Sequence, residues 1–130
     1  MRGTIQPTPA ELEILDVLWE RDRATVREIF EETERRKKSS YTTVLKLMQI
    51  MLEKGLVERD EHGKAHVYRA AQSRKRTQQG LVGSLLDRAF RGSALSLVQH
   101  VLETKPATRE ELDAIRKMID DAEARSGGRK

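Results

Sequence analysis

Apolar residues recur every three or four positions along three segments in the first half of the chain, which predicts three amphipathic helices. The expected apolar face of the first helix consists of Leu12, Leu15, Leu18 and Trp19. The inward positions of the second are Val26, Ile29, Phe30 and Thr33. The stripe of the third consists of Val44, Leu47, Met48, Met51 and Leu52. Each helix is short, so each needs a partner surface.

Residues that start and stop helices flank these segments. Thr8 and Thr25 each precede a Glu by three residues, which is the pattern of a capping box. Ser39 or Ser40 is the expected cap of the third helix. Gly55 follows the third stripe where a left-handed residue commonly ends a helix.

A β-hairpin is expected directly after the third helix. Residues 56–60 read as a strand, residues 61–64 as a turn and residues 65–70 as a returning strand. Tyr68 is expected to pack beneath this hairpin. Three helices followed by a hairpin is the element order of a winged helix-turn-helix, so the predicted fold is mostly α with a small β-hairpin wing.

The second half of the chain predicts three further helices, over residues 74–91, 94–103 and from 109 onward, with a domain boundary near Gln72. We expect a winged-helix domain over residues 1–72 and a helical dimerisation domain over residues 73–130. Its apolar positions are Leu81, Leu85, Phe90, Leu95, Val98, Leu102, Leu112, Ile115 and Ile119. About 50 helical residues make a marginal core alone, and closed homo-oligomers are the commonest remedy, so a homodimer is expected.

Composition and charge narrow the class of protein. Charged residues make up 35% and aromatic residues 4%, which favours a helical aliphatic core over a β-sandwich. The absence of cysteine excludes disulfides and thiolate metal sites. No apolar run reaches the roughly 18 residues of a membrane span, so a soluble cytoplasmic protein is expected. The net charge of +4 comes from residues 73–130, because residues 1–72 carry 13 basic and 13 acidic side chains.

The outward face of the third helix differs from an ordinary solvated surface. Glu and Lys are usual on such a surface, whereas this face carries Thr42, Thr43, Lys46 and Gln49. Gln pairs with adenine, Thr contacts a thymine methyl group or a phosphate, and Lys reaches guanine or phosphate. Ser40 and Tyr41 occupy the amino end of the same helix, where phosphate is favoured. The sequence therefore predicts a DNA-recognition helix, with a merely polar, capped surface as the alternative.

Two basic groups adjoin this helix. The run before it contains Arg36, Lys37 and Lys38, for which we expect contacts with DNA phosphates, although charge runs are often only solvated. The hairpin turn carries Lys64, which is suited to phosphate or the minor groove. A plain solvated turn is the alternative for this tip.

The sequence gives little support for an enzymatic function. His62 and His66 lie near Asp60 and Glu61 on the expected hairpin, so a metal-dependent hydrolase is an alternative. No further ligand stands at helical spacing, and the sequence contains neither a glycine-rich phosphate loop nor a nucleophile elbow. We therefore expect no catalytic residue, no metal and no cofactor.

Four stretches resemble the penicillinase-repressor family, the BlaI/MecI group. They are PTPAELEILDVLW, TVREIFEE, SYTTVLKLMQIMLEKGLV and AHVYRA, with a weaker match at GSALSLVQHVLE. The resemblance implies a dimeric repressor with a winged helix that reads a half-site and a helical dimerisation arm. It also implies a co-encoded membrane sensor protease, whose signal leads to cleavage within that arm.

The chain departs from the family pattern at three places. Lys46 and Ile50 occupy positions where relatives read TVxTxLQRL, which implies a different operator preference. The family's Asn–Phe cleavage pair corresponds to His100 and Val101 here, a candidate protease-sensitive bond in an altered setting. The cysteine cluster of copper-responsive relatives is absent.

Three hypotheses follow. The leading one is a homodimeric transcriptional repressor on a palindromic or pseudo-palindromic operator, derepressed by proteolysis or loss of dimerisation. The second is a winged-helix module for protein contacts, which the neutral N-terminal half allows. The third is a hairpin metal site with hydrolase activity.

Overall fold

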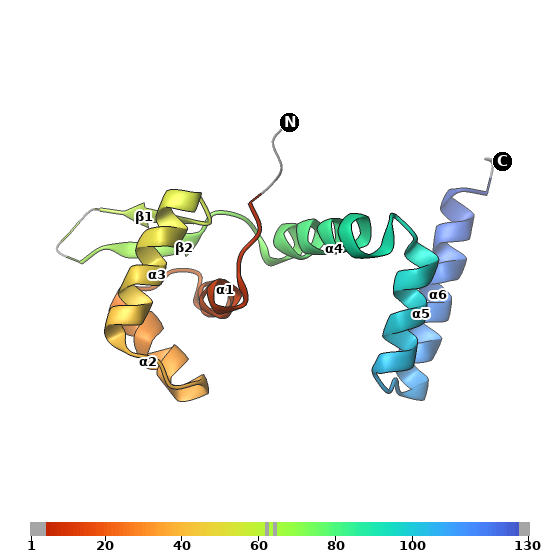
Figure 1. Cartoon of the computed structure of the whole chain (residues 1–130), viewed down its shortest axis with the longest axis horizontal. Coiled ribbons are helices and arrows are strands. Elements are labelled where there is room, and N and C mark those ends of the chain that lie inside the picture. Colours follow the sequence, from red (N-terminus) through yellow and green to blue (C-terminus); the bar gives the residue numbers. More distant parts are fainter. Residues whose placement is uncertain (1–4, 62, 64, 128–130) are drawn as a thin grey trace. The chain divides into compact units, whose positions relative to one another are not determined.

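The computed structural model describes residues 5–127 except residues 62 and 64. The described part contains mostly helix and one antiparallel hairpin, which confirms the predicted fold class (Figure 1). It divides into two compact units, one ending at Ser84 and the other beginning at Leu85.

The first unit is a winged helix-turn-helix. Its elements, in chain order, are α1 (Pro9–Arg21), α2 (Val26–Arg36), α3 (Tyr41–Lys54), β1 (Val57–Asp60), β2 (Val67–Ala70) and the first turns of α4 (Arg74–Phe90). The α1 helix packs on α2 and β2, and α3 packs on α2 and β1, so one core joins the helices to the hairpin (Figure 1).

Local side chains define the helix starts as expected. The hydroxyl of Thr8 accepts from the amide of Glu11 at 3.2 Å, and the Glu11 carboxylate accepts from the Thr8 amide at 2.9 Å. Thr25 and Glu28 form the same reciprocal pair. Ser40 is the cap of α3, and Gly55 ends that helix with φ of 80°. These contacts satisfy amide groups that have no partner inside the helix.

The buried face of α1 differs from the predicted one. The buried apolar residues of α1 are Ile14, Leu15, Val17 and Leu18, whereas the expected Leu12 and Trp19 are only partly buried. The reason is that α1 contacts both α2 and β2, so it buries a wider arc than a single stripe. On α3 the expected Val44, Met48 and Met51 are buried, and the expected Leu47 and Leu52 are partly buried against the same core.

The hairpin is shorter than predicted, with strands of four residues each. Val57 pairs with Ala70 and Asp60 with Val67. Tyr68 is buried beneath the hairpin, as expected. Its backbone also exchanges two hydrogen bonds, of 3.0 and 2.8 Å, with Ala24 from the connection between α1 and α2. This bridge ties the base of the hairpin to the helical core.

One buried ion pair joins the start of α1 to the end of α3. Glu11 is 2% exposed, and its two carboxylate oxygens accept from Lys54 Nζ at 2.8 and 2.9 Å. Burial raises the pKa of Glu11, but the hydrogen bond from Lys54 and the capping bond from Thr8 outweigh it and hold that pKa below its usual value. Lys54 thus permits a carboxylate inside the core.

The start of α4 is fastened to α1. The indole nitrogen of Trp19 donates to the carbonyl oxygen of Gln72 at 2.9 Å. Arg74 lies over the Trp19 ring, 5.2 Å from its centroid, and forms an ion pair with Asp16 at 2.8 Å. The first turns of α4 therefore belong to the winged-helix unit.

The second unit contains the remainder of α4, α5 (Ala94–Thr104) and α6 (Arg109–Arg125). The helices α5 and α6 lie side by side (Figure 1), with a groove of about 310 Å³ between them that Val101, Ile115 and Met118 help to line. None of the described residues from Leu85 onward is buried. Leu95 is 79% exposed, so this unit presents apolar side chains to solvent.

Candidate nucleic-acid interface

The face of α3 opposite the core carries polar side chains. Since Val44, Met48 and Met51 turn into the core, helical geometry directs Thr42, Lys46 and Gln49 outward, and all three are exposed. Among the described residues, none forms an ion pair with Lys46. Within the described part of the chain, the Gln49 amide and the Lys46 ammonium therefore remain available on this face of α3.

The amino end of α3 is built from its own hydroxyl groups. The Ser40 hydroxyl accepts from the amide of Thr43 at 3.1 Å and donates to the Thr43 hydroxyl at 2.8 Å. Tyr41 is 41% exposed and packs edge-on against Phe30 of α2, with ring centroids 5.6 Å apart. These contacts fix the start of α3, where Ser40 also serves as the helix cap.

Two grooves border this face of α3. One, of about 330 Å³, lies between α2, α3 and the hairpin, and Arg27, Tyr41 and His66 are among its lining residues. The other, of about 150 Å³, lies between α1, α2 and α3, and Lys38 and Thr43 are among its lining residues. A recognition helix in a major groove has a phosphate backbone along each side, so grooves on both flanks suit that ligand.

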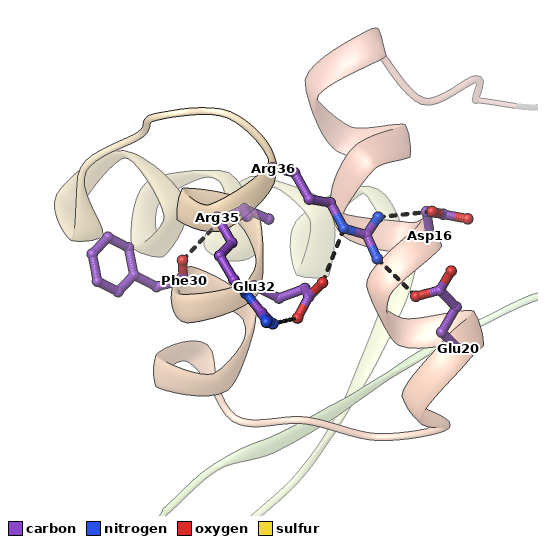
Figure 2. A network of polar contacts seen from close by, with 7 residues as sticks. Asp16, Glu20, Phe30, Glu32, Arg35 and Arg36 are labelled. Atoms are coloured by element: carbon purple, nitrogen blue, oxygen red, sulfur yellow. Dashed lines mark hydrogen bonds and ion pairs between the residues drawn. The ribbon is translucent and has the colours of Figure 1, made fainter.

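The basic run at the end of α2 is largely paired with carboxylates. Figure 2 shows Arg36 reaching three of them, at 2.8 Å to Asp16, 2.7 Å to Glu20 and 3.1 Å to Glu32. Hydrogen bonds from Arg36 to Asp16 and then to Glu32 raise the pKa of Arg36 above its already high value. Arg35 also binds Glu32 (Figure 2). The Arg36 charge is therefore balanced within the protein.

The other two predicted contact residues of the basic run, Lys37 and Lys38, are exposed to solvent. Lys37 forms an ion pair with Glu13 at 3.3 Å, with its side chain 74% exposed. Lys38 is exposed, and no ion pair to it is found in the part of the chain that the structure describes. Lys37 and Lys38 therefore retain access to a ligand, and their phosphate contacts stay predictions.

The wing is described only in part. Arg59 on β1 forms an ion pair with Glu61 at 2.7 Å, and that carboxylate raises the pKa of Arg59. The predicted contact residue Lys64 and the neighbouring His62 lie outside the described residues. No group of three or more metal-ligating side chains is found among the residues that are described.

The predicted dimerisation residues lie on α4, α5 and α6. Leu85, Leu95, Val98, Leu102 and Ile119 are exposed, and Leu81, Phe90, Leu112 and Ile115 are half-buried. The His100–Val101 bond lies inside α5, where His100 Nδ1 is 2.9 Å from the Ser96 carbonyl oxygen and the His100 ring packs against Phe90.

Within the described ranges no helix is long and apolar enough to cross a membrane.

Sequence reasoning missed two features of this interface. Arg27 lies over the Tyr41 ring, 5.8 Å from its centroid, beside the hairpin-side groove. Asp16 binds Arg36 through one oxygen and Arg74 through the other, both at 2.8 Å. Both features join residues from separate helices, and no spacing along the chain signals them.

Comparison with known proteins gives concordant results. The penicillinase repressor family matches residues 7–121. The transcriptional regulator BlaI of Mycobacterium tuberculosis is 32% identical over 121 residues, covering 92% of this chain and 86% of that protein. The methicillin resistance regulatory protein MecI of Staphylococcus aureus is 21% identical, covering 90% and 95%.

One solved structure agrees with the winged-helix fold of the first unit. The solution structure of the DNA-binding domain of the repressor BlaI superposes with a TM-score of 0.50 at 23% identity, covering 57% of this chain and 90% of that domain. The family match spans most of the chain, and the mycobacterial relative exceeds 30% identity. The predicted resemblance is confirmed: the chain belongs to the penicillinase repressor family, which consists of transcriptional repressors and not of enzymes.

Proposed function

We propose that this chain represses transcription by binding, as a homodimer, a palindromic or pseudo-palindromic operator in double-stranded DNA. The main observation in support of this proposal is the exposed face of α3, where Thr42, Lys46 and Gln49 lie opposite the buried stripe. Lys46 would contact guanine or phosphate, and Gln49 an adenine edge. Ser40, Tyr41, Thr43, Lys38 and Lys64 would contact the flanking backbone.

The exposed apolar side chains of the second unit support the dimer. Exposed fractions of 79% for Leu95, 45% for Val98 and 43% for Leu102 leave much of one face of α5 in solvent. A patch of this kind on a small helical unit is covered most simply by a second copy, because two-fold pairing buries it on both protomers. Residues 73–130 would then act as the dimerisation domain.

Derepression would follow from weaker dimerisation. A single winged helix makes few base contacts, so operator affinity depends on both protomers binding together. Cleavage at His100–Val101 by a co-encoded membrane sensor protease would divide α5 within its apolar stretch. The bond lies in a helix, so a protease would have to unwind that turn before cutting.

The test is fluorescence anisotropy of the full chain on the duplex upstream of its own gene, with a scrambled duplex as control, over a salt series. A preference of about 10³ or more for the native duplex, with steep salt dependence, is expected. Equal and salt-insensitive affinity for both duplexes would contradict the proposal. In the same experiment Gln49→Ala should reduce the preference for the native duplex.

A further inference from the structure

The hairpin-side groove next to α3 holds a cation, Arg27, that no carboxylate among the described residues neutralises. Arg27 is exposed at the start of α2, and no acidic side chain lies within ion-pair distance of it in the described ranges. Instead, its guanidinium carbon lies 5.8 Å from the centroid of the Tyr41 ring. Stacking on an aromatic face orients a guanidinium without cancelling its charge.

The tyrosine beneath Arg27 is itself held in place. Its ring meets the Phe30 ring edge-on at an interplanar angle of 76°, and Tyr41 begins α3 next to the Ser40 cap. Leu45, one turn later on α3, lines the same groove and is half-buried. Arg27 is therefore positioned by two helices, beside an apolar floor and on the flank of the recognition face.

Arg36 and Arg27 differ in how many carboxylates would compete with a DNA phosphate for the guanidinium. A phosphate that approached Arg36 would compete with three carboxylates at 2.7 to 3.1 Å, whereas a phosphate at Arg27 would have no such competitor among the described residues. Neutralising a phosphate releases counterions only when the cation was not already neutralised inside the protein. Of these two arginines, Arg27 has the greater capacity to bind a polyanion.

We propose that Arg27, positioned by Tyr41, forms a phosphodiester site for the DNA strand that borders α3 on the hairpin side. This inference rests on the proposed function and adds a contact that the sequence pattern did not indicate. The planar guanidinium matches two phosphate oxygens, and Leu45 provides an apolar surface for the adjoining deoxyribose. Because the contact reads no base, it strengthens binding to every sequence alike.

The test measures sequence-independent binding of the full chain. Anisotropy of a labelled random-sequence duplex of about 30 base pairs, long enough for half-sites one or two turns apart, is recorded from low to high salt. Arg27→Ala should make the log–log salt slope flatter by about 0.9 for each protomer bound. Arg27→Lys, which keeps the charge, should restore most of that slope.

Arg125→Ala is the matched control, because it removes the same charge from the end of α6 and should leave the slope unchanged. A wild-type slope for Arg27→Ala, or equal flattening by Arg125→Ala, would overturn the inference while leaving the proposed function standing. A wild-type protein that shows no salt-dependent binding would overturn the proposed function, and the inference with it.

Discussion

The two compact units bury their apolar residues to very different extents. In the unit ending at Ser84, residues such as Ile29, Met48 and Met51 have no exposed surface. In the unit beginning at Leu85, no described residue is buried, although its helices are equally well capped. Capping and periodicity therefore make helices in both units, but only the first has a core of its own.

This difference separates local helix formation from folding stability. The Thr108–Glu111 capping box of α6 has the same reciprocal bonds as those of α1 and α2, at 3.0 Å each. Helices of such lengths are marginal in water without a packed face. The stability of the second unit should therefore increase with protein concentration, whereas the stability of the first unit should not.

The largest expected effect comes from a charge placed in the first core. Met48→Asp would bury a carboxylate without a partner where the methionine is 0% exposed, and should cost more than about 4 kcal/mol in the free energy of unfolding. Urea unfolding followed by circular dichroism measures this loss. Leu95→Asp, which makes the same charge change at an exposed position, should leave the first unit's transition in place.

A smaller but still large effect is expected for self-association. Val98→Asp places a charge on the exposed apolar face of α5 and should weaken dimerisation about 30-fold or more, because a desolvated interface rejects an unpaired carboxylate. Sedimentation equilibrium measures the change. The neighbouring Gln99→Asp should change dimer affinity far less, and equal effects at both positions would argue against this face as the interface.

The buried ion pair should contribute less than the core. Lys54→Met would leave the Glu11 carboxylate in the core without its ammonium partner, at a cost of about 2 kcal/mol at neutral pH, since Lys54 is itself 27% exposed. Lys46→Met, on the exposed face of the same helix, is the control and should change stability little. Urea unfolding of the two variants gives the comparison.

The same pair predicts a pH dependence. The pKa of Glu11 is lower in the folded protein than its usual 4.5, so its contribution is full above that value and is lost as the pH falls through the lower folded pKa. In Lys54→Met, burial then dominates and should raise that pKa. The variant's deficit relative to wild type should therefore shrink in acid, and a constant deficit from pH 7 to 4 would contradict this account.

The smallest effect is expected at Arg36. Its ion pairs are partly exposed to solvent, so Arg36→Gln should cost only about 0.5 kcal/mol in stability. The salt slope for random-sequence DNA should change less than in Arg27→Ala, because carboxylates already neutralise Arg36. A larger change at Arg36 than at Arg27 would contradict this account and favour Arg36 over Arg27 as a phosphate contact.

Much of the fold could be predicted because its signals are local. The capping boxes at Thr8 and Thr25, the stripe on α3 and the stop at Gly55 all involve residues within one or two helical turns. The exposed face of α3 follows directly from the same periodicity. Local hydrogen bonds and side-chain spacing are thus readable in the sequence.

The tertiary structure decided which of these residues have partners. Asp16 meets both Arg36 and Arg74, Glu11 meets Lys54, and Arg27 meets Tyr41, each across a gap of at least 14 positions in the sequence. The sequence by itself determined the helices, the hairpin and the outward face of α3. Whether a given cation is neutralised or remains free depends on packing between elements, because an ion pair requires two side chains to lie within a few ångströms.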